Sequence, residues 1–215
     1  MAIKEHDFIE IEYTGTITDS GEVFDTTDRA VAEKGGIFEE KMAYGPVTIC
    51  VGEGQVVRGI DEALIGKEPG KVYSVEIPPE KGFGARNAKY IQLIATSKFR
   101  KQNISPAPGL QVNIDGLVGI VKAVTGGRTL VDFNHPLSGR DLSYELKINA
   151  IVTDTKKKLE SYMALKLGAR DAKVSVEAGA ARITMKARVP DEIREKLTEQ
   201  IRGVIPELKT LEFRE

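Results

Sequence analysis

The stretch that decides the fold runs from Val51 to Leu64 and reads VGEGQVVRGIDEAL. Residues 47–51 lead into it as an apolar run, which is typical of a buried strand. The apolar positions of residues 60–65 then follow the spacing of a short amphipathic helix, and Gly66 ends it. The glycines are spaced G-x-G-x-x-x-x-G, which is not the G-x-G-x-x-G of nucleotide-binding turns. The stretch therefore predicts a strand, a glycine-rich turn and a helix.

Strands with one solvent-facing side flank this stretch. Ile9, Ile11 and Tyr13 alternate with polar residues, which is the period of a half-buried strand. Residues 71–77 alternate in the same way, and a Pro-Pro pair ends the run because proline cannot donate to a ladder. Residues 26–45 are polar and have no firm period, so we expect a long excursion from the sheet with a helical turn.

A self-contained β unit is predicted between residues 87 and 133. Residues 110–114 alternate strictly between apolar and polar. Residues 118–124 and 130–133 are apolar-rich and flank Gly126-Gly127, which is a hairpin signal.

The pattern changes at Asp154, a residue type that caps helices. From there the periodicity predicts a helix, two strands, a helix and a closing strand, with Pro190 opening the second helix. A unit of about 60 residues buries little area, so we expect it to pack on a second copy or on the rest of the chain. The chain thus divides into residues 1–86 with 134–153, residues 87–133, and residues 154–215.

Composition limits the class of protein. Hydrophobic residues make up 41% of the 215, which is enough for folded cores, and the formal net charge of −1 favours neither nucleic acid nor membrane as a partner. The single cysteine, Cys50, sits in an apolar run and predicts a buried thiol in a reducing, cytoplasmic protein. Residues 155–215 hold 14 Lys/Arg against 10 Asp/Glu, which favours a solvated helix face over contact with ribosomal RNA.

Four motifs resemble those of FKBP-type peptidyl-prolyl cis-trans isomerases. They are GEVFD at 21–25, the 51–64 stretch, KGFG at 81–84, and NHPLSGRDL at 134–142, which resembles the closing motif of the SlyD-like branch. That branch carries an insert-in-flap domain between the last two motifs, where this chain has its extra β unit. Residues 154–215 resemble the added domain of long-type archaeal FKBPs.

The resemblance implies an α+β fold and an isomerase pocket. The fold is an antiparallel half-barrel with a short helix, an inserted small β domain and a C-terminal α-β-β-α-β domain. An apolar pocket favours the twisted X-Pro amide over the planar one, with no nucleophile, metal or cofactor. Asp25 is expected at the rim, bonding the substrate or Tyr13. The catalytic residues implied by the resemblance are Tyr13, Phe24, Asp25, Val56, Val57, Ile60, Phe83 and Tyr144.

Two positions depart from the family pattern and leave a second interpretation open. Ile60 stands where the family commonly has tryptophan, and Phe83 lacks the hydroxyl of the usual tyrosine. The first interpretation is an isomerase that is also a folding chaperone. The second is a holdase whose pocket is degenerate, so that the protein acts only by binding unfolded chains through its insert.

The insert is expected to capture unfolded or nascent polypeptides. It holds more apolar residues than a unit of its size buries easily, and an exposed apolar patch marks an interaction site. We also expect a homodimer through residues 154–215. The predicted substrate-binding residues of the insert are Ile91, Leu93, Ile94, Phe99, Val118 and Ile120.

Overall fold

The computed structural model describes residues 1–186 and 189–214 and divides the chain into two compact units. The first unit combines Met1–Lys81 with Asp141–Glu215, and the second is Gly82–Arg140. Within the described ranges, no helix has the length and apolar character needed to cross a membrane.

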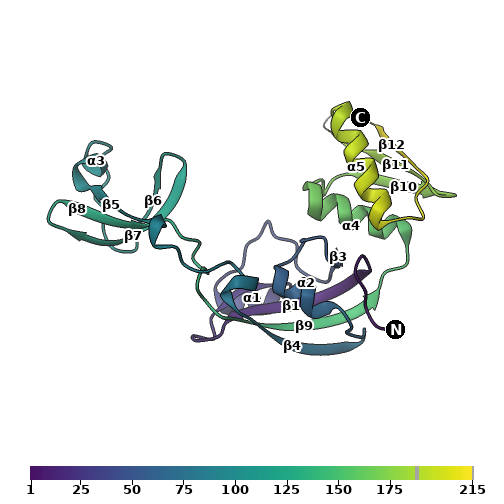
Figure 1. Ribbon diagram of the computed structural model, residues 1–215, viewed down its shortest axis with the longest axis horizontal. Coiled ribbons are helices and arrows are strands. Elements are labelled where there is room, and N and C mark those ends of the chain that lie inside the picture. Colours follow the sequence, from purple (N-terminus) through teal and green to yellow (C-terminus); the bar gives the residue numbers. More distant parts are fainter. Residues whose placement is uncertain (187–188, 215) are drawn as a thin grey trace. The chain divides into compact units, whose positions relative to one another are not determined.

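An antiparallel five-stranded sheet forms the body of the first unit (Figure 1). The strand order is β2-β1-β9-β4, and β3 pairs with the first half of β1 while β2 pairs with its second half. The elements of this part are β1 (Phe8–Ile17), β2 (Val23–Thr26), α1 (Arg29–Gly35), β3 (Val47–Cys50), α2 (Arg58–Leu64), β4 (Lys71–Ile77), a 3₁₀ turn (Pro79–Lys81) and β9 (Leu142–Ile151).

Strand alternation and one glycine explain how this sheet packs. Ile9 and Ile11 of β1 are completely buried, as their period of two predicts. Helix α2 lies against β4, where a Cβ added at Gly59 would come within 2.6 Å of Ile77. Glycine at this position therefore allows the helix to approach the sheet closely, which sets Ile60 in the core.

The segment after β9 folds as helices on one side of a small sheet. Sheet order is β10-β11-β12, with β10 and β11 antiparallel and β11 and β12 parallel. The Asp154 side chain caps α4 by accepting from the Lys157 amide at 2.7 Å. The elements are α4 (Thr155–Leu167), β10 (Lys173–Glu177), β11 (Ala180–Thr184), α5 (Asp191–Val204) and β12 (Thr210–Arg214).

This C-terminal segment shares one hydrophobic core with the strands that precede it. Phe8 of β1 and Cys50 of β3 lie in the same buried cluster as Leu159 and Tyr162 of α4. The Lys166 ammonium adds a hydrogen bond of 2.8 Å to the Glu53 carbonyl. The segment therefore buries its apolar surface on its own chain, which is one of the two arrangements that its small size predicts.

The second unit is a four-stranded antiparallel sheet with one short helix. Its order is β5-β8-β7-β6, so β5 and β6 are edge strands. Helix α3 was not predicted; it places Phe99 in a core with Val121 and Val131. The elements are a 3₁₀ turn (Ala88–Tyr90), β5 (Ile91–Ala95), α3 (Thr96–Arg100), β6 (Gln111–Ile114), β7 (Leu117–Thr125) and β8 (Arg128–Asp132).

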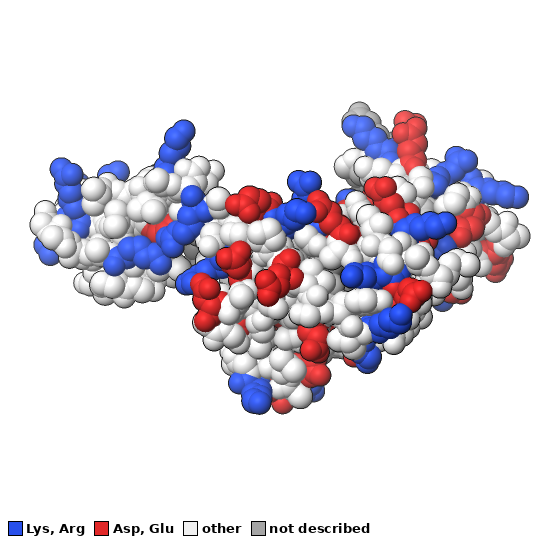
Figure 2. All heavy atoms as spheres, turned by 60° about the horizontal axis from the view of Figure 1, so that its bottom comes forward, with Lys and Arg blue, Asp and Glu red and all other residues white. Residues whose placement is uncertain are grey.

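The two units differ in the charges that they expose. Figure 2 shows many acidic side chains over the first unit, whereas basic side chains dominate the exposed face of the second unit at the left of that view.

Candidate active site

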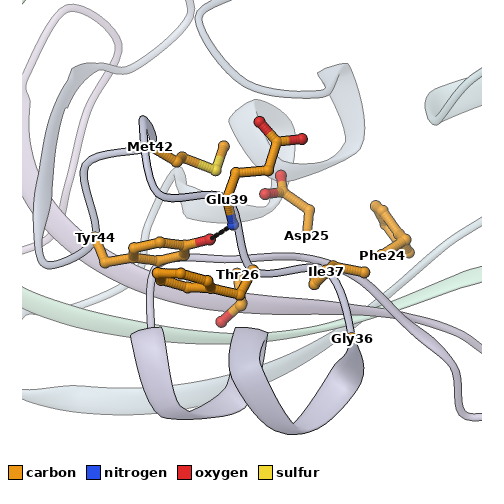
Figure 3. A pocket seen from close by; sticks show the side chains of 9 residues that line it. Phe24, Asp25, Thr26, Gly36, Ile37, Glu39, Met42 and Tyr44 are labelled. Carbon is orange, nitrogen blue, oxygen red and sulfur yellow. Dashed lines mark hydrogen bonds between the residues drawn. The ribbon is translucent and has the colours of Figure 1, made fainter.

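A cavity of about 420 Å³ opens beside β2 in the first unit (Figure 3). One wall comes from β2 itself, through Phe24, Asp25 and Thr26. The opposite wall comes from the segment that follows α1, which the sequence predicted only as an excursion from the sheet. The residues of this second wall are Gly36, Ile37, Phe38, Glu39, Met42 and Tyr44.

Paired backbone and hydroxyl bonds fix β2 and the residues after it against β1. The Thr27 amide donates to the Tyr13 carbonyl at 2.9 Å, and the Tyr13 amide donates to the Thr27 hydroxyl at 2.9 Å. The Thr14 and Thr26 hydroxyls lie 2.8 Å apart. These bonds hold Asp25 in register with Gly15, its partner on β1.

Aromatic stacking gives the second wall its shape. The Phe38 and Tyr44 rings stack with centroids 5.5 Å apart, and the Arg29 guanidinium lies 5.1 Å from the Phe38 centroid. The Tyr44 hydroxyl accepts a 3.0 Å hydrogen bond from the Glu39 amide (Figure 3). The wall is therefore tied to α1, and it presents Glu39 and Met42 toward the cavity.

Helix α1 is held at both ends, which fixes where this wall begins. The Asp28 carboxylate accepts from the amides of Ala30 and Val31 at 2.7 and 3.1 Å. Gly36 follows the helix with φ of 71°, a conformation that favours glycine. The left-handed turn at Gly36 directs the chain away from the helix and into the cavity wall.

Three aromatic rings meet behind the cavity. The Phe24 ring stands edge-on to Tyr144 with centroids 5.6 Å apart, and Tyr13 lies 6.1 Å from Tyr144. Two of them, Tyr144 and Phe24, lie over Gly15, where an added Cβ would be 2.7 Å from Tyr144 Cε1 and 2.8 Å from Phe24 Cζ. The ring cluster therefore requires glycine at position 15.

Asp25 is one of two carboxylates that line this cavity, and Glu39 is the other. The Asp25 carboxylate is half-buried and accepts a hydrogen bond from the Tyr13 hydroxyl. Burial raises the pKa of Asp25, while the hydrogen bonds from Tyr13 and from the Thr26 amide oppose that shift. Burial, with the nearby Asp25 charge, also raises the pKa of the Tyr13 hydroxyl, so this group remains a donor at neutral pH.

The structure brings four of the eight predicted catalytic residues together: Tyr13, Phe24, Asp25 and Tyr144. Val56 lines a separate cavity with Gly52 and Asp61. Val57 precedes the first residue of α2, and Ile60 is 1% exposed in the core. Phe83 belongs to the second unit, where its ring stacks on His135 with centroids 4.6 Å apart.

The sequence interpretation missed the second wall of the cavity. Phe38 and Tyr44 lie in a stretch without strand or helix period, so no pattern assigned them a role. Two aromatic residues six positions apart in an otherwise polar segment, after a Gly-Gly pair, were the signal that could have identified them.

The predicted residues of the insert fall into two groups. Leu93 and Val118 are 62% and 52% exposed, and Ile91 is exposed beside Leu93 on edge strand β5. Ile94 and Ile120 are half-buried. Phe99, by contrast, is 3% exposed and fills the core of the unit, so its side chain presents no surface to a partner.

Register shows that the exposed group shares one face of the insert sheet. Leu93 lies opposite Leu130, and Ile91 lies in a row with Asp132 and Ile120. Directly paired residues point to the same side of a sheet. The core residues, including Val121 and Val131, alternate with these and point to the other side, where Phe99 packs against them. The insert therefore has an apolar face that its own core does not use.

Comparison with known proteins identifies the family. Residues 1–100 match the family described as FKBP-type peptidyl-prolyl cis-trans isomerase, and residues 92–137 match one described as FKBP26, IF domain. A short-type peptidyl-prolyl cis-trans isomerase of Methanocaldococcus jannaschii is 33% identical over 149 residues, covering 69% of this chain and 94% of the relative.

Two further relatives extend the comparison. A probable FKBP-type 16 kDa peptidyl-prolyl cis-trans isomerase of Pseudomonas fluorescens is 34% identical, covering 54% of this chain and 79% of the relative. The SlyD isomerase of Treponema pallidum is 27% identical and covers 70% of this chain and 79% of the relative. With these relatives, and with a cavity beside Asp25 that Phe24, Phe38 and Tyr44 help to line, the chain belongs to the FKBP-type peptidyl-prolyl cis-trans isomerases, on their SlyD-like branch.

Proposed function

We propose that this isomerase is also a folding chaperone, which captures unfolded polypeptide on its insert and rotates X-Pro bonds in the cavity beside β2. The observation that carries the catalytic half is the joint placement of Tyr13, Phe24, Asp25 and Tyr144 next to that cavity. The observation that carries the capture half is the apolar sheet face with Leu93 and Val118 exposed.

The reaction requires the cavity to stabilise a twisted amide and requires no covalent step. Amide resonance makes an X-Pro bond planar, with a rotation barrier of about 20 kcal/mol. Resonance is lost at the twisted transition state, so its carbonyl is less polar and its nitrogen regains a lone pair. An apolar surface such as the Phe24 ring, which Tyr144 supports from behind, stabilises the twisted form more than the planar one.

Asp25 has a positioning and binding role in this proposal. Its carboxylate is an acceptor that can hold a donor of the bound chain, such as a backbone amide, beside the rings. The Tyr13 hydroxyl and the Thr26 amide each donate one hydrogen bond to the carboxylate, and its remaining lone pairs are left for the substrate. Binding energy from this contact orients the prolyl bond in the cavity.

The insert contributes by holding clients. Its apolar face can bury side chains of an unfolded chain, and edge strand β5 offers main-chain groups to an extended segment. A client held on the insert presents its X-Pro bonds to the same protein molecule at raised effective concentration. This contribution applies to protein clients and is absent for short peptides.

One experiment tests the capture half with a matched control. Leu93→Ser combined with Val118→Ser removes two exposed apolar side chains of the insert, and Val72→Ser removes one that is 57% exposed on β4 of the first unit. We expect the double variant to lose several-fold in the rate of proline-limited protein refolding while its rate on a proline tetrapeptide stays at the wild-type value. The Val72 variant should match wild type in both assays. Equal refolding rates in all three proteins would refute capture by this face.

The second interpretation, a holdase with a degenerate pocket, rests on Ile60 and Phe83 at positions where the family commonly has tryptophan and tyrosine. The same pair of assays separates it from the first. A holdase would suppress aggregation of an unfolded client and leave prolyl isomerisation in peptides at the uncatalysed rate. The identified family and the ring cluster around Asp25 favour the active enzyme.

We further propose that the chain forms a homodimer through its C-terminal segment and works in the cytoplasm on unfolded or nascent polypeptides. Strand β12 is a sheet edge, Ile193 of α5 is 51% exposed, and other residues of α5 and β12 line a cavity between these two elements. Removing the whole segment would expose Phe8 and Cys50, so a point variant is the better test. Sedimentation should give a dimer for the wild type and a monomer for Ile193→Lys, and a monomeric wild type would exclude this assembly.

A further inference from the structure

Charge is distributed very unequally between the two units. The second unit, Gly82–Arg140, holds eight Lys/Arg and two Asp/Glu, a formal charge of +6 in 59 residues. The first unit, Met1–Lys81 with Asp141–Glu215, holds 23 Lys/Arg and 30 Asp/Glu, a formal charge of −7. The net charge of −1 for the whole chain therefore conceals a basic second unit, in which the insert, residues 87–133, holds six Lys/Arg against two Asp/Glu.

The cations of the insert are largely without internal partners. One of its two acids, Asp132, is taken by an ion pair with Arg86 and by hydrogen bonds from Asn134. In the ranges that the structure describes, no carboxylate lies within ion-pair distance of five exposed cations of this unit. These are Lys89, Lys98, Arg100, Lys101 and Arg128.

In the first unit, by contrast, several cations form ion pairs with carboxylates. Arg58 pairs with Glu62 at 2.7 Å and Lys147 pairs with Glu12 at 2.6 Å, with similar pairs at several other positions. Cations that already have a carboxylate partner add little attraction for a further anion, whereas unpaired cations at one surface create a positive field. The insert is thus a part of this chain whose unpaired cations attract anions.

Strand register places part of this positive charge on the apolar face of the insert. Arg128 precedes Leu130 by two residues on β8, so both side chains point to the same side of the sheet. Leu130 lies opposite Leu93, and Ala95 lies opposite Arg128. Lys122 is exposed at the irregularity of β7 that separates Val121 from Ala123.

Helix α3 adds a second basic group at the neighbouring edge strand. Lys98 and Arg100 lie on this helix and Lys101 follows it, and the helix begins directly after β5. Because α3 packs on the core side of the sheet, a chain laid along β5 would meet Leu93 on one side of the strand and these cations on the other. Figure 2 shows the basic side chains gathered over this unit.

We propose that the insert selects polypeptide segments in which Asp or Glu residues stand beside apolar ones. This inference rests on the proposed capture function and specifies its substrate. Apolar client side chains cover Leu93 and its neighbours, while client carboxylates pair with Arg128 and the α3 cations. Complementary charge raises the association rate and disfavours segments rich in Lys or Arg, because like charges repel.

The chemistry of the face favours a polypeptide over a nucleic acid. Single-stranded nucleic acid is bound by aromatic side chains on which bases stack, along a basic groove. The exposed apolar residues of the insert are aliphatic, apart from Tyr90, and they lie next to an unpaired strand edge. Aliphatic side chains at an open edge are the features that bind an extended peptide.

Two fluorescent, proline-free peptides of equal length and equal apolar content test the proposal on the full chain. One carries four Asp/Glu and the other four Lys, and binding is followed by anisotropy at low and at physiological salt. The basic variant Lys98→Gln/Lys101→Gln/Arg128→Gln is compared with Lys173→Gln/Lys196→Gln/Arg202→Gln, three exposed cations of the C-terminal segment.

We expect the wild type to bind the acidic peptide about tenfold more tightly than the basic one at low salt, and less selectively as salt rises. The insert variant should lose most of that ratio, and the C-terminal variant should keep it. Equal binding of both peptides would leave capture intact and overturn this inference. Binding of neither would overturn capture and the inference with it. A single-stranded RNA with the same charge as the acidic peptide is the third ligand. If the wild type bound this RNA more tightly than the acidic peptide, the partner of the insert would be a nucleic acid and the inference would be overturned.

Discussion

The hydroxyl of Tyr13 donates a hydrogen bond to the half-buried carboxylate of Asp25, at the edge of the cavity beside β2. Both residues are placed by the same backbone bonds between β1 and the end of β2. The pairing of β1 with β2 therefore sets the distance between these two side chains. Replacing either residue removes the hydrogen bond that the other one makes.

Tyr13→Phe removes the donor and keeps the ring. A half-buried carboxylate without this bond is less stable when ionised, so we expect a loss of about 0.5–1.5 kcal/mol in the free energy of unfolding and a lower isomerase rate. Tyr73→Phe is the matched control, because the Tyr73 hydroxyl also bonds within the first unit, to the Glu68 backbone at 3.0 and 3.1 Å. It should lose stability and keep the rate; a fall in rate for both variants would argue against a specific role of Tyr13.

The raised pKa of Asp25 predicts how stability depends on pH. Because the folded state disfavours the ionised carboxyl, the folded protein holds this proton to higher pH than the unfolded chain does. The penalty is absent below the ordinary pKa of 3.8 and is complete above the raised pKa of the folded protein. Urea unfolding across this window should show wild type losing stability relative to Asp25→Asn as pH rises. A difference that stays constant with pH would contradict the raised pKa.

Gly15→Ala tests the ring cluster by overpacking. The new methyl group would come within 2.8 Å of Tyr144 and Phe24, so one ring must move, at a cost of about 1–3 kcal/mol and with loss of isomerase activity. The control is Gly203→Ala in α5, where an added Cβ meets nothing within 4 Å and alanine should stabilise the helix by about 0.5–1 kcal/mol. Thermal unfolding of both variants measures the contrast, and a neutral Gly15→Ala would show that the rings do not meet at this position.

Cys50 should be inert in the folded protein. Burial raises the pKa of its thiol to about 12, so almost no reactive thiolate exists at neutral pH. Labelling with a thiol reagent at pH 8 is therefore expected to follow the rate of unfolding. Leu159→Ala, which removes a fully buried neighbour from the same core, should destabilise that core by about 2–5 kcal/mol and speed labelling. Rapid labelling of native wild type would show that the core around Cys50 is open.

Sequence patterns predicted the parts of this protein in which local chemistry decides the structure. Ile9 and Ile11 alternate with polar residues and are buried on β1, and Asp154 begins α4 because its carboxylate caps the first turn. The wall formed by Phe38 and Tyr44 has no such local signal. It depends on ring stacking and on the cation of Arg29, contacts that exist only after the chain has folded back.

The insert shows a second limit of sequence patterns. The apolar character of Ile91, Leu93, Ile94 and Phe99 predicts that all four belong to one capture surface. In the structure the chain turns from β5 into α3 within residues 91–99, so Leu93 remains exposed while Phe99 enters the core. A helix of five residues is too short to show a period, and burial within the run follows from packing on Val121 and Val131.

The central claim is that the cavity next to Asp25 accelerates prolyl rotation. The most direct measurement is the rate of cis-to-trans isomerisation of a proline tetrapeptide with wild type and with Asp25→Ala, each shown to be folded by circular dichroism. The account predicts that the variant loses about tenfold or more in kcat/KM and still suppresses aggregation of an unfolded client. A variant that isomerises the peptide as fast as wild type would contradict it.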